Sequence, residues 1–233
     1  MALPKLEVPT YELTIPSTGK KAKYRPFLVK EYKALLMATE SDDSDITRVM
    51  EEIVDICTFN KLNLKTLASF DIEYIFLKMR AKSVGEKIDL VLTCRSCENK
   101  IDFSVNIDNV ELQKDKDHNS KFMLTESVGV EMKYPRFKLD LPDLIQTGID
   151  NYFEEIERCI KGIYTSDGKY FDITVDDKEE LKEFVASMNI EQFGKIEKFF
   201  QTMPKLSKSV ELVCTNCNAI NKAKVEGLAN FFV

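Results

Sequence analysis

The chain has 233 residues, 44% of them hydrophobic and 31% charged, a composition that supports a folded core and excludes a disordered tail. Its net charge of -6, from 33 basic and 39 acidic residues, disfavours a general nucleic-acid binder. No stretch of roughly 18 to 20 uncharged apolar residues is present and no apolar leader follows the start, so we expect a soluble, unsecreted protein with no membrane partner. The single histidine, His118, lies in a polar run where we expect it to be exposed, and it excludes triads and multi-histidine metal sites.

Residues 1–28 predict an N-terminal β-hairpin. Apolar side chains alternate from Tyr11 to Ile15, stop at the turn residues 16–19 and resume from Ala22 to Tyr24. Residues 29–85 predict a helical region, because apolar positions there recur with helical spacing. The expected helices cover about 29–40, 44–57 and 69–83.

Two features of these helices are specific enough to test. Four apolar residues of the first helix crowd toward one side and predict its buried face: Tyr32, Leu35, Leu36 and Met37. Ser69 is expected to cap the start of the third helix, because a serine oxygen accepts a hydrogen bond from a free backbone amide there.

The rest of the chain predicts two further hairpins with a mixed region between them. Residues 86–107 and 206–233 show period-two alternation around a central Cys-x-x-Cys pair, and the second hairpin ends in an aromatic tail. Residues 108–205 predict an inserted α+β region, in which 144–164 is expected to be one helix. The predicted fold class is therefore α+β.

The two Cys-x-x-Cys pairs are the strongest chemical signal. Cys94 with Cys97, and Cys214 with Cys217, stand at the tips of the predicted hairpins. A two-residue gap lets both thiolates of a tight turn point at one ion about 2.3 Å away, so each pair supplies half of a tetrahedral site. We expect these zinc knuckles to bind one structural zinc ion as a split zinc ribbon, since about 116 positions separate the pairs.

Other states of the same cysteines remain open. Rubredoxin-like iron uses four thiolates, and two disulfides or free thiols are further alternatives, whereas a thioredoxin-like pair would need a strand-to-helix setting. The residue after a knuckle usually adopts a left-handed conformation, which Asn218 tolerates and Glu98 is expected to resist. Zinc with four thiolates has no open coordination position, so this interpretation predicts structure and no enzyme activity.

The remaining reactive residues have simpler interpretations. Cys57 and Cys159 fall in predicted helices and are expected to pack in the core. Paired carboxylates such as those at 42–43 and 176–177 are expected to be solvated helix ends. The glycines stand apart from one another, so no phosphate-binding loop and no small-molecule substrate are expected.

Several stretches resemble the baseplate hub subunit, or hub assembly protein, family of T-even-like contractile-tailed bacteriophages. The resemblance lies in residues 13–20, 24–31, 70–74 and 80–86, in both cysteine pairs, and from 199–204 to 227–228. It covers both ends of the chain and is weak over about 108–170. It implies a role in the virion baseplate, or in hub assembly in the host cytoplasm, with other baseplate or hub proteins as partners. A permanent component and an assembly factor are both consistent with it.

Two surfaces and one rival function follow from the residues. The N-terminal hairpin with Tyr11 and Tyr24, and the C-terminal residues 231–233, are candidate contact surfaces, the latter also able to dock on its own core. A zinc-ribbon nucleic-acid or transcription module is the alternative function. It is disfavoured because acidic residues balance the basic ones near the tips: Arg95, Lys100, Lys222 and Lys224 against Glu98, Asp102 and Glu211.

Overall fold

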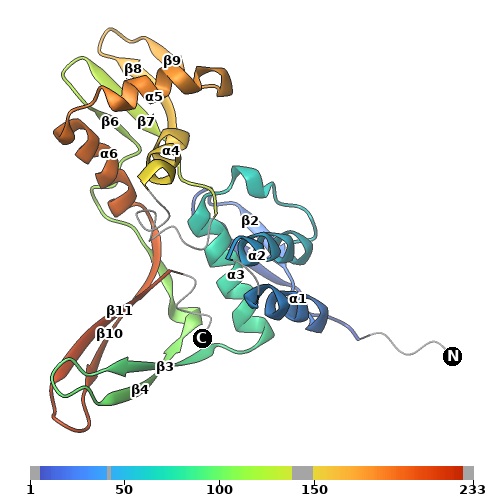
Figure 1. Cartoon of the computed structure of the whole chain (residues 1–233). Coiled ribbons are helices and arrows are strands. Elements are labelled where there is room, and N and C mark those ends of the chain that lie inside the picture. The colour runs from blue at the N-terminus through green and yellow to red at the C-terminus, as the bar shows by residue number, and fades with distance from the viewer. Residues whose placement is uncertain (1–5, 41–42, 138–148, 228–233) are drawn as a thin grey trace. The chain divides into compact units, whose positions relative to one another are not determined.

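The computed structural model describes residues 6–40, 43–137 and 149–227, and it has a mixed α+β fold (Figure 1). The chain divides into two compact units. The first, called here the knuckle unit, comprises residues 1–113, 136–139 and 205–233; the second, the inserted unit, comprises 114–135 and 140–204. Within the described residues, no helix is long and apolar enough to cross a membrane.

The knuckle unit combines three helices with small antiparallel sheets among its described residues. The helices are α1 (Val29–Thr39), α2 (Asp43–Cys57) and α3 (Ser69–Ser83), with short 3-10 turns η1 (Leu64–Thr66) and η2 (Ile107–Asn109). The strands are β1 (Tyr11–Thr14), β2 (Lys21–Tyr24), β3 (Lys87–Thr93), β4 (Lys100–Asn106), β5 (Glu111–Gln113), β10 (Lys205–Val213) and β11 (Ile220–Glu226). β1 pairs with β2, β3 pairs with β4, and the third sheet has the order β11-β10-β5, which confirms the three predicted hairpins.

Helix α3 forms the centre of the knuckle unit's core. Its side chains are buried on most sides, including Ile75, Phe76 and Leu77 at 0% exposure, as expected for a helix covered by neighbours all round. The Phe27 ring stacks on Phe76 with 6.0 Å between centroids, which joins the segment before α1 to this core. Each fully buried side chain of this size stabilises the fold by about 1.5–3 kcal/mol.

In α1 and α3 the side-chain carboxylate of the third helical residue accepts a hydrogen bond from the backbone amide of the residue just before the helix. Glu31 accepts from the Leu28 amide at 2.8 Å and is paired with Arg25 at 2.9 Å. Asp71 accepts from the Ala68 amide at 3.1 Å and from the amide and hydroxyl of Ser17. The prediction that Ser69 caps α3 is therefore wrong, because Asp71 performs this role and also anchors the β1–β2 turn.

The predicted inner face of α1 is also partly wrong. Leu35 is buried, but Tyr32, Leu36 and Met37 are 42%, 48% and 61% exposed. The buried residues of α1 are Glu31, Leu35 and Ala38, which form a narrow strip. Glu31 can be buried there because its carboxylate is bonded to Arg25 and to the Leu28 amide. The apolar residues of α1 thus lie on two faces, one packed and one exposed.

The inserted unit places helices against an antiparallel sheet of order β6-β7-β8-β9. Its described elements are β6 (Lys121–Met123), β7 (Val128–Met132), α4 (Ile149–Cys159), β8 (Ile160–Thr165), β9 (Tyr170–Asp172), η4 (Val175–Asp177), α5 (Lys178–Ala186) and α6 (Ile190–Thr202). A separate apolar cluster fills this unit, with Ile156, Ile160 and Ile196 fully buried. α6 begins with a capping box, in which Asn189 and Gln192 each accept from the other's amide at 2.8–2.9 Å.

The prediction of one helix over 144–164 is wrong from Ile160 onward, and its first residues, 144–148, lie outside the described part of the chain. α4 ends at Cys159 and the next residue begins β8, which pairs with β7. Ile160 and Ile163 are β-branched and suit the sheet, whereas Gly162 weakens a helix. A Cβ at Gly162 would collide with the Tyr170 ring, so glycine lets the neighbouring strand lie close.

His118 is not exposed as predicted; it is half-buried in the inserted unit. Its Nδ1 lies 2.9 Å from the Thr202 hydroxyl and its Nε2 lies 3.0 Å from the Tyr134 hydroxyl. Its ring centroid lies 5.1 Å from that of Phe199 and 5.7 Å from that of Tyr134. Burial holds the pKa of His118 below its usual value, so the neutral ring is the native form at neutral pH.

Candidate metal centre

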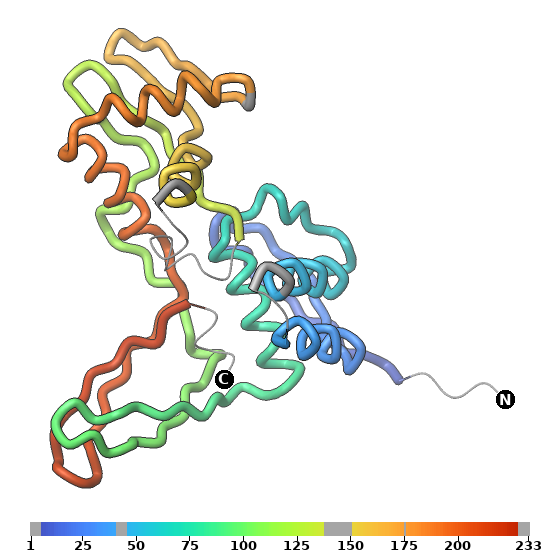
Figure 2. The backbone as a smooth tube through the Cα atoms, viewed as in Figure 1, coloured from blue at the N-terminus to red at the C-terminus, as the bar shows by residue number. Residues whose placement is uncertain are grey.

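Two hairpins of the knuckle unit meet at their tips (Figure 2), the first drawn in green and the second in red. β3 and β4 pair along their whole lengths, from Lys87↔Asn106 to Thr93↔Lys100. β10 and β11 pair from Ser207↔Glu226 to Val213↔Ile220. Regular pairing up to the last residue before each cysteine turn gives both tips a defined position, so the turns are presented by rigid ribbons.

The two turns have the same backbone hydrogen bonds. The Cys94 amide donates to the Asn99 carbonyl at 2.8 Å, and the Cys214 amide donates to the Ala219 carbonyl at 2.9 Å. The residues after the second cysteines, Glu98 and Asn218, have φ angles of 59° and 57°. The expectation that Glu98 would resist the left-handed conformation is wrong: it adopts the same turn as Asn218, which leaves the first knuckle as well formed as the second.

These turns bring the four predicted cysteines together. The sulfur atoms of Cys94, Cys97, Cys214 and Cys217 all lie within 4.8 Å of one another. Between the hairpins, the sulfurs of Cys94 and Cys217 lie 3.7 Å apart and those of Cys97 and Cys214 lie 3.6 Å apart. A tetrahedron of sulfurs about 2.3 Å from a central ion has edges of about 3.8 Å, so these separations fit a four-thiolate site.

The cluster is partly enclosed. Cys94 and Cys214 are 1% and 0% exposed, whereas Cys97 is half-buried and Cys217 is exposed. None of the four forms a disulfide, since separations of 3.6–3.7 Å are far longer than the roughly 2.05 Å of a disulfide bond. An ion placed here would have protein behind it and one open side from which to enter.

The environment of the sulfurs favours thiolates unequally. Hydrogen bonds from the Ser96 backbone amide and, to a smaller extent, from the Asn221 side-chain amide lower the pKa of Cys94 to about 6 despite burial. The amides of Cys217 and Asn216 lower the pKa of Cys214. The Ala219 amide lowers the pKa of Cys217, but its neighbouring thiols raise it more strongly, to about 12. Four thiolates in this space repel one another, and a divalent cation would offset that repulsion.

Three asparagines that the sequence interpretation missed lie around the sulfurs. Their side-chain amides are within hydrogen-bonding range of a cysteine on the opposite hairpin: Asn221 with Cys94 at 3.5 Å, Asn216 with Cys97 at 3.6 Å and Asn99 with Cys214 at 3.9 Å. The sequence does show several asparagines near the second knuckle. It does not show which cysteine each one contacts, because every one of these contacts joins different hairpins.

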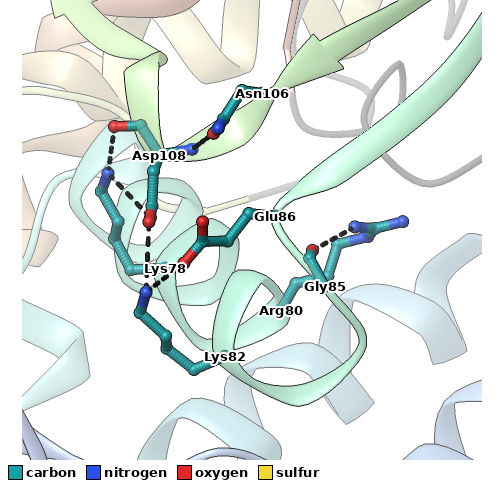
Figure 3. A network of polar contacts seen from close by, with 7 residues as sticks. All are labelled: Lys78, Arg80, Lys82, Gly85, Glu86, Asn106 and Asp108. Atoms are coloured by element: carbon teal, nitrogen blue, oxygen red, sulfur yellow. Dashed lines mark hydrogen bonds and ion pairs between the residues drawn. The ribbon is translucent and has the colours of Figure 1, made fainter.

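A polar network fixes the base of the first hairpin on α3 (Figure 3). The Lys82 ammonium lies between the carboxylates of Glu86, at 2.5 Å, and Asp108, at 3.1 Å. Lys78 donates to the Asp108 carbonyl at 2.9 Å, and the Asp108 amide donates to Asn106 at 2.9 Å. The network joins α3, the start of β3 and η2, so it orients the hairpin that carries Cys94 and Cys97.

The two remaining cysteines lie elsewhere and are buried, as expected for core packing. Cys57 is 0% exposed, and burial raises its pKa to about 11. Cys159 is 2% exposed, at the end of α4. A high pKa keeps the Cys57 thiol protonated and unreactive at neutral pH.

Taken together, the fold and the cysteine cluster define an α+β protein in which two hairpins distant in sequence meet at their tips. The chain belongs to the family described as T4 bacteriophage base plate protein, which matches residues 8–233. No curated protein and no solved structure matches it. The resemblance to T-even-like phage baseplate proteins is thereby confirmed and extends over the middle of the chain. Family membership gives the protein a structural role in the tail baseplate of the virion, with other baseplate proteins as its partners.

Proposed function

We propose that the protein is a structural or assembly component of the baseplate hub, that it acts through protein–protein contacts without enzyme activity, and that one zinc ion clamps it. The proposed ligands are Cys94, Cys97, Cys214 and Cys217. The observation that carries the metal assignment is the cluster of four sulfurs within 4.8 Å, built from two hairpins far apart in the sequence. Resemblance to hub proteins at both ends of the chain supports the hub assignment, with host cytoplasm as the place of assembly.

Zinc fits this donor set better than iron does for a structural role. Zinc has no redox chemistry and accepts tetrahedral thiolates without further ligands, and it would supply a cross-link between the hairpins. Cys94 and Cys214 are the buried ligands, and Cys97 and Cys217 close the site from the solvent side. In this proposal 86–107 and 206–233 form the split ribbon, and 108–205 is inserted into it. Iron bound by the same cysteines is the alternative that metal analysis distinguishes.

The surface that we assign to partner binding is the exposed face of α1. Val29, Tyr32 and Leu36 are spaced i, i+3, i+7 and are 83%, 42% and 48% exposed. The exposed residues Lys30 and Lys33 lie on the same helix. We therefore propose that another baseplate protein covers this face with an apolar groove that has an acidic rim, since opposite charges at a rim set register and encounter rate.

The sequence suggested two contact surfaces, the N-terminal hairpin and the C-terminal residues 231–233. Tyr24 is only 4% exposed and Tyr11 is half-buried, with 5.7 Å between their ring centroids, so these rings pack on each other and the core. Tyr24 is therefore not available to a partner, whereas the use of the hairpin itself as a contact surface remains a prediction. Residues 231–233 lie outside the described residues, and their docking remains a prediction.

A direct test of this function introduces Leu36→Asp into the phage and counts copies of the chain by mass spectrometry in hub intermediates and mature tails. We expect at least about a tenfold loss from the hub, because a buried carboxylate without a partner is costly at an interface. Ala34→Asp, at an exposed position on another side of α1, is the matched control and should be incorporated normally. Equal incorporation of both variants would contradict the α1 surface, and cross-links only to proteins outside the hub would contradict the hub assignment. Wild-type chain in intermediates but not in mature tails would identify an assembly factor.

The alternative function, nucleic-acid binding by the ribbon, has no specific observation in its favour. Lys222 is paired with Glu211 at 3.3 Å, and Lys224 is paired with Glu226 at 2.5 Å. These pairs neutralise two of the basic residues that such a function would use. Salt-dependent binding to DNA would be the result that revives it.

A further inference from the structure

The three asparagines around the cysteine cluster share one geometrical property. Asn99 lies on the first hairpin and reaches a sulfur of the second, whereas Asn216 and Asn221 lie on the second and reach sulfurs of the first. The contacts span 115, 119 and 127 residues of sequence. Within the described residues, these amides therefore bridge the same two ribbons as the cysteines do.

Asn221 is held in a defined orientation. It is only 4% exposed, and its Oδ1 accepts from the Arg95 amide at 3.1 Å. An amide nitrogen can only donate, so the side-chain oxygen must face Arg95 and the side-chain NH2 group must face the other way. That NH2 group donates to the Ala219 carbonyl at 3.0 Å and to the Cys94 sulfur at 3.5 Å. Both N–H bonds of this buried group are thus directed by the fold.

The other two amides are more accessible. Asn216 is exposed and donates to Cys97 at 3.6 Å; Asn99 is half-buried and its NH2 group is shared between the Lys100 carbonyl, at 3.1 Å, and Cys214, at 3.9 Å. Together the three amides serve three different sulfurs. Asn221 is the most buried and lies nearest to its sulfur, and Asn99 lies farthest from its sulfur, so the hydrogen bond to sulfur should be strongest for Asn221 and weakest for Asn99.

A site of four thiolates around a divalent ion has a formal charge of about -2, and donors around it stabilise that charge. We propose that Asn221, Asn216 and Asn99 form an outer shell that holds the thiolates of one hairpin against the other. They are positioning residues: they touch the ligand sulfurs and not the metal. This inference rests on the zinc site proposed above and adds the residues that set its affinity.

The test compares metal binding by the full chain before and after Asn221→Asp. Aspartate keeps an oxygen that the Arg95 amide can reach and replaces the donor facing Cys94 with a carboxylate. We expect the zinc dissociation constant, measured by competition with a chromophoric chelator, to rise about 10–100-fold, as for other outer-shell changes. The cobalt-substituted variant should keep the charge-transfer and ligand-field bands of four thiolates, because the ligands themselves are unchanged. Asn63→Asp, an exposed position in the same unit, makes the same change of charge and should bind as the wild type does.

The possible results separate this inference from the zinc assignment. A wild-type protein that takes up neither zinc nor cobalt overturns both. A wild type that binds one ion and an Asn221→Asp variant that binds within twofold of it overturn the outer shell alone. Should circular dichroism show that Asn221→Asp is unfolded, the Asn99→Ala/Asn216→Ala double variant at accessible positions decides the matter. It should weaken zinc binding several-fold, about threefold to tenfold, and unchanged affinity there overturns the inference.

Discussion

The knuckle unit and the inserted unit are held together in different ways. In the knuckle unit, the tips of two hairpins come together across 117 to 123 residues of sequence at a cluster of four cysteines. The inserted unit has a continuous apolar core in which helices cover one sheet, and the rings of His118, Tyr134 and Phe199 stack in this unit, with His118 hydrogen-bonded to Tyr134. The comparison teaches that a packed α+β unit can be inserted between two hairpins whose tips meet again at a cysteine cluster. Loss of metal should therefore destabilise the knuckle unit alone, and a cavity in the apolar core of the inserted unit should destabilise that unit alone.

The largest effect is expected from Cys214→Ser. Removal of one buried ligand should release the zinc and lower the free energy of unfolding of the knuckle unit by about 5 kcal/mol, as for a cross-link that closes a loop of this length. Hydrogen exchange followed by mass spectrometry, with metal analysis, should show faster exchange in β3–β4 and β10–β11 and little change in α4–α6. Thr215→Ser, in the same turn, is the control and should retain the metal. Equal destabilisation of both units would contradict the separation.

Phe199→Ala should produce the complementary result in the inserted unit. Phe199 is 2% exposed and stacks on both His118 and Tyr134, so its truncation leaves a cavity that costs about 3–4 kcal/mol. Chemical unfolding should shift accordingly while the zinc content stays at one ion. Phe171→Ala, at a ring that is 53% exposed, is the matched control and should have a small effect. Loss of zinc from Phe199→Ala would show that the two units are not independent.

Asp108→Asn tests the polar network at the base of the first hairpin. The substitution removes a charge that faces Lys78 and Lys82, and we expect a loss of about 1 kcal/mol because these groups are only partly buried. The loss should shrink at high salt, since partly exposed ion pairs are screened. Asp102→Asn, at an exposed position on β4, is the control. An effect that does not respond to salt would assign the role of Asp108 to packing instead.

The last predicted effects concern pH, and they should have opposite signs in the two units. Burial raises the pKa of Glu73, on α3, to about 7, although Lys205 lowers it. The native state then binds this proton more tightly than the unfolded chain does, so the knuckle unit loses stability as pH rises from about 4.5 to 7. Burial lowers the pKa of His118, so the inserted unit gains stability as pH rises toward about 6.5 and loses it as pH falls through the lowered pKa.

Urea unfolding at pH 5 and 7.5 checks these signs when each unit is followed by hydrogen exchange. Glu73→Gln should flatten the pH dependence of the knuckle unit alone, and His118→Gln that of the inserted unit alone. If stability depends on pH in the same way in both variants and in the wild type, groups other than Glu73 and His118 set the pH dependence.

Regular local patterns were predictable from the sequence. Period-two alternation located all three hairpins, and the Cys-x-x-Cys spacing placed four cysteines at two tips, because both signals depend on neighbours along the chain. The boundary between α4 and β8 at Cys159–Ile160 was missed, since apolar spacing alone does not separate a helix that runs directly into a buried strand. The exposed residues of α1 were assigned to the core for a similar reason: the pattern shows which residues are apolar, and not which face finds a partner.

Apart from the meeting of the two cysteine pairs, contacts between distant segments were not predictable. Asp71 anchors Ser17 across 54 residues, and Asn221 reaches Cys94 across 127. No local spacing relates such residues, so the cap of α3 and the asparagine shell became visible only once the chain was folded. The expected state of His118 failed in the same way, because Thr202 and Phe199, which enclose it, lie more than 80 residues further along the chain.

The central claim is that one zinc ion with four sulfur ligands joins the two hairpins. X-ray absorption at the zinc edge, on protein purified without added metal, measures this directly. We predict one zinc per chain with a single shell of four sulfurs at about 2.3 Å. Protein that is folded without metal, or that has oxygen or nitrogen atoms in place of one or more sulfurs, would contradict it.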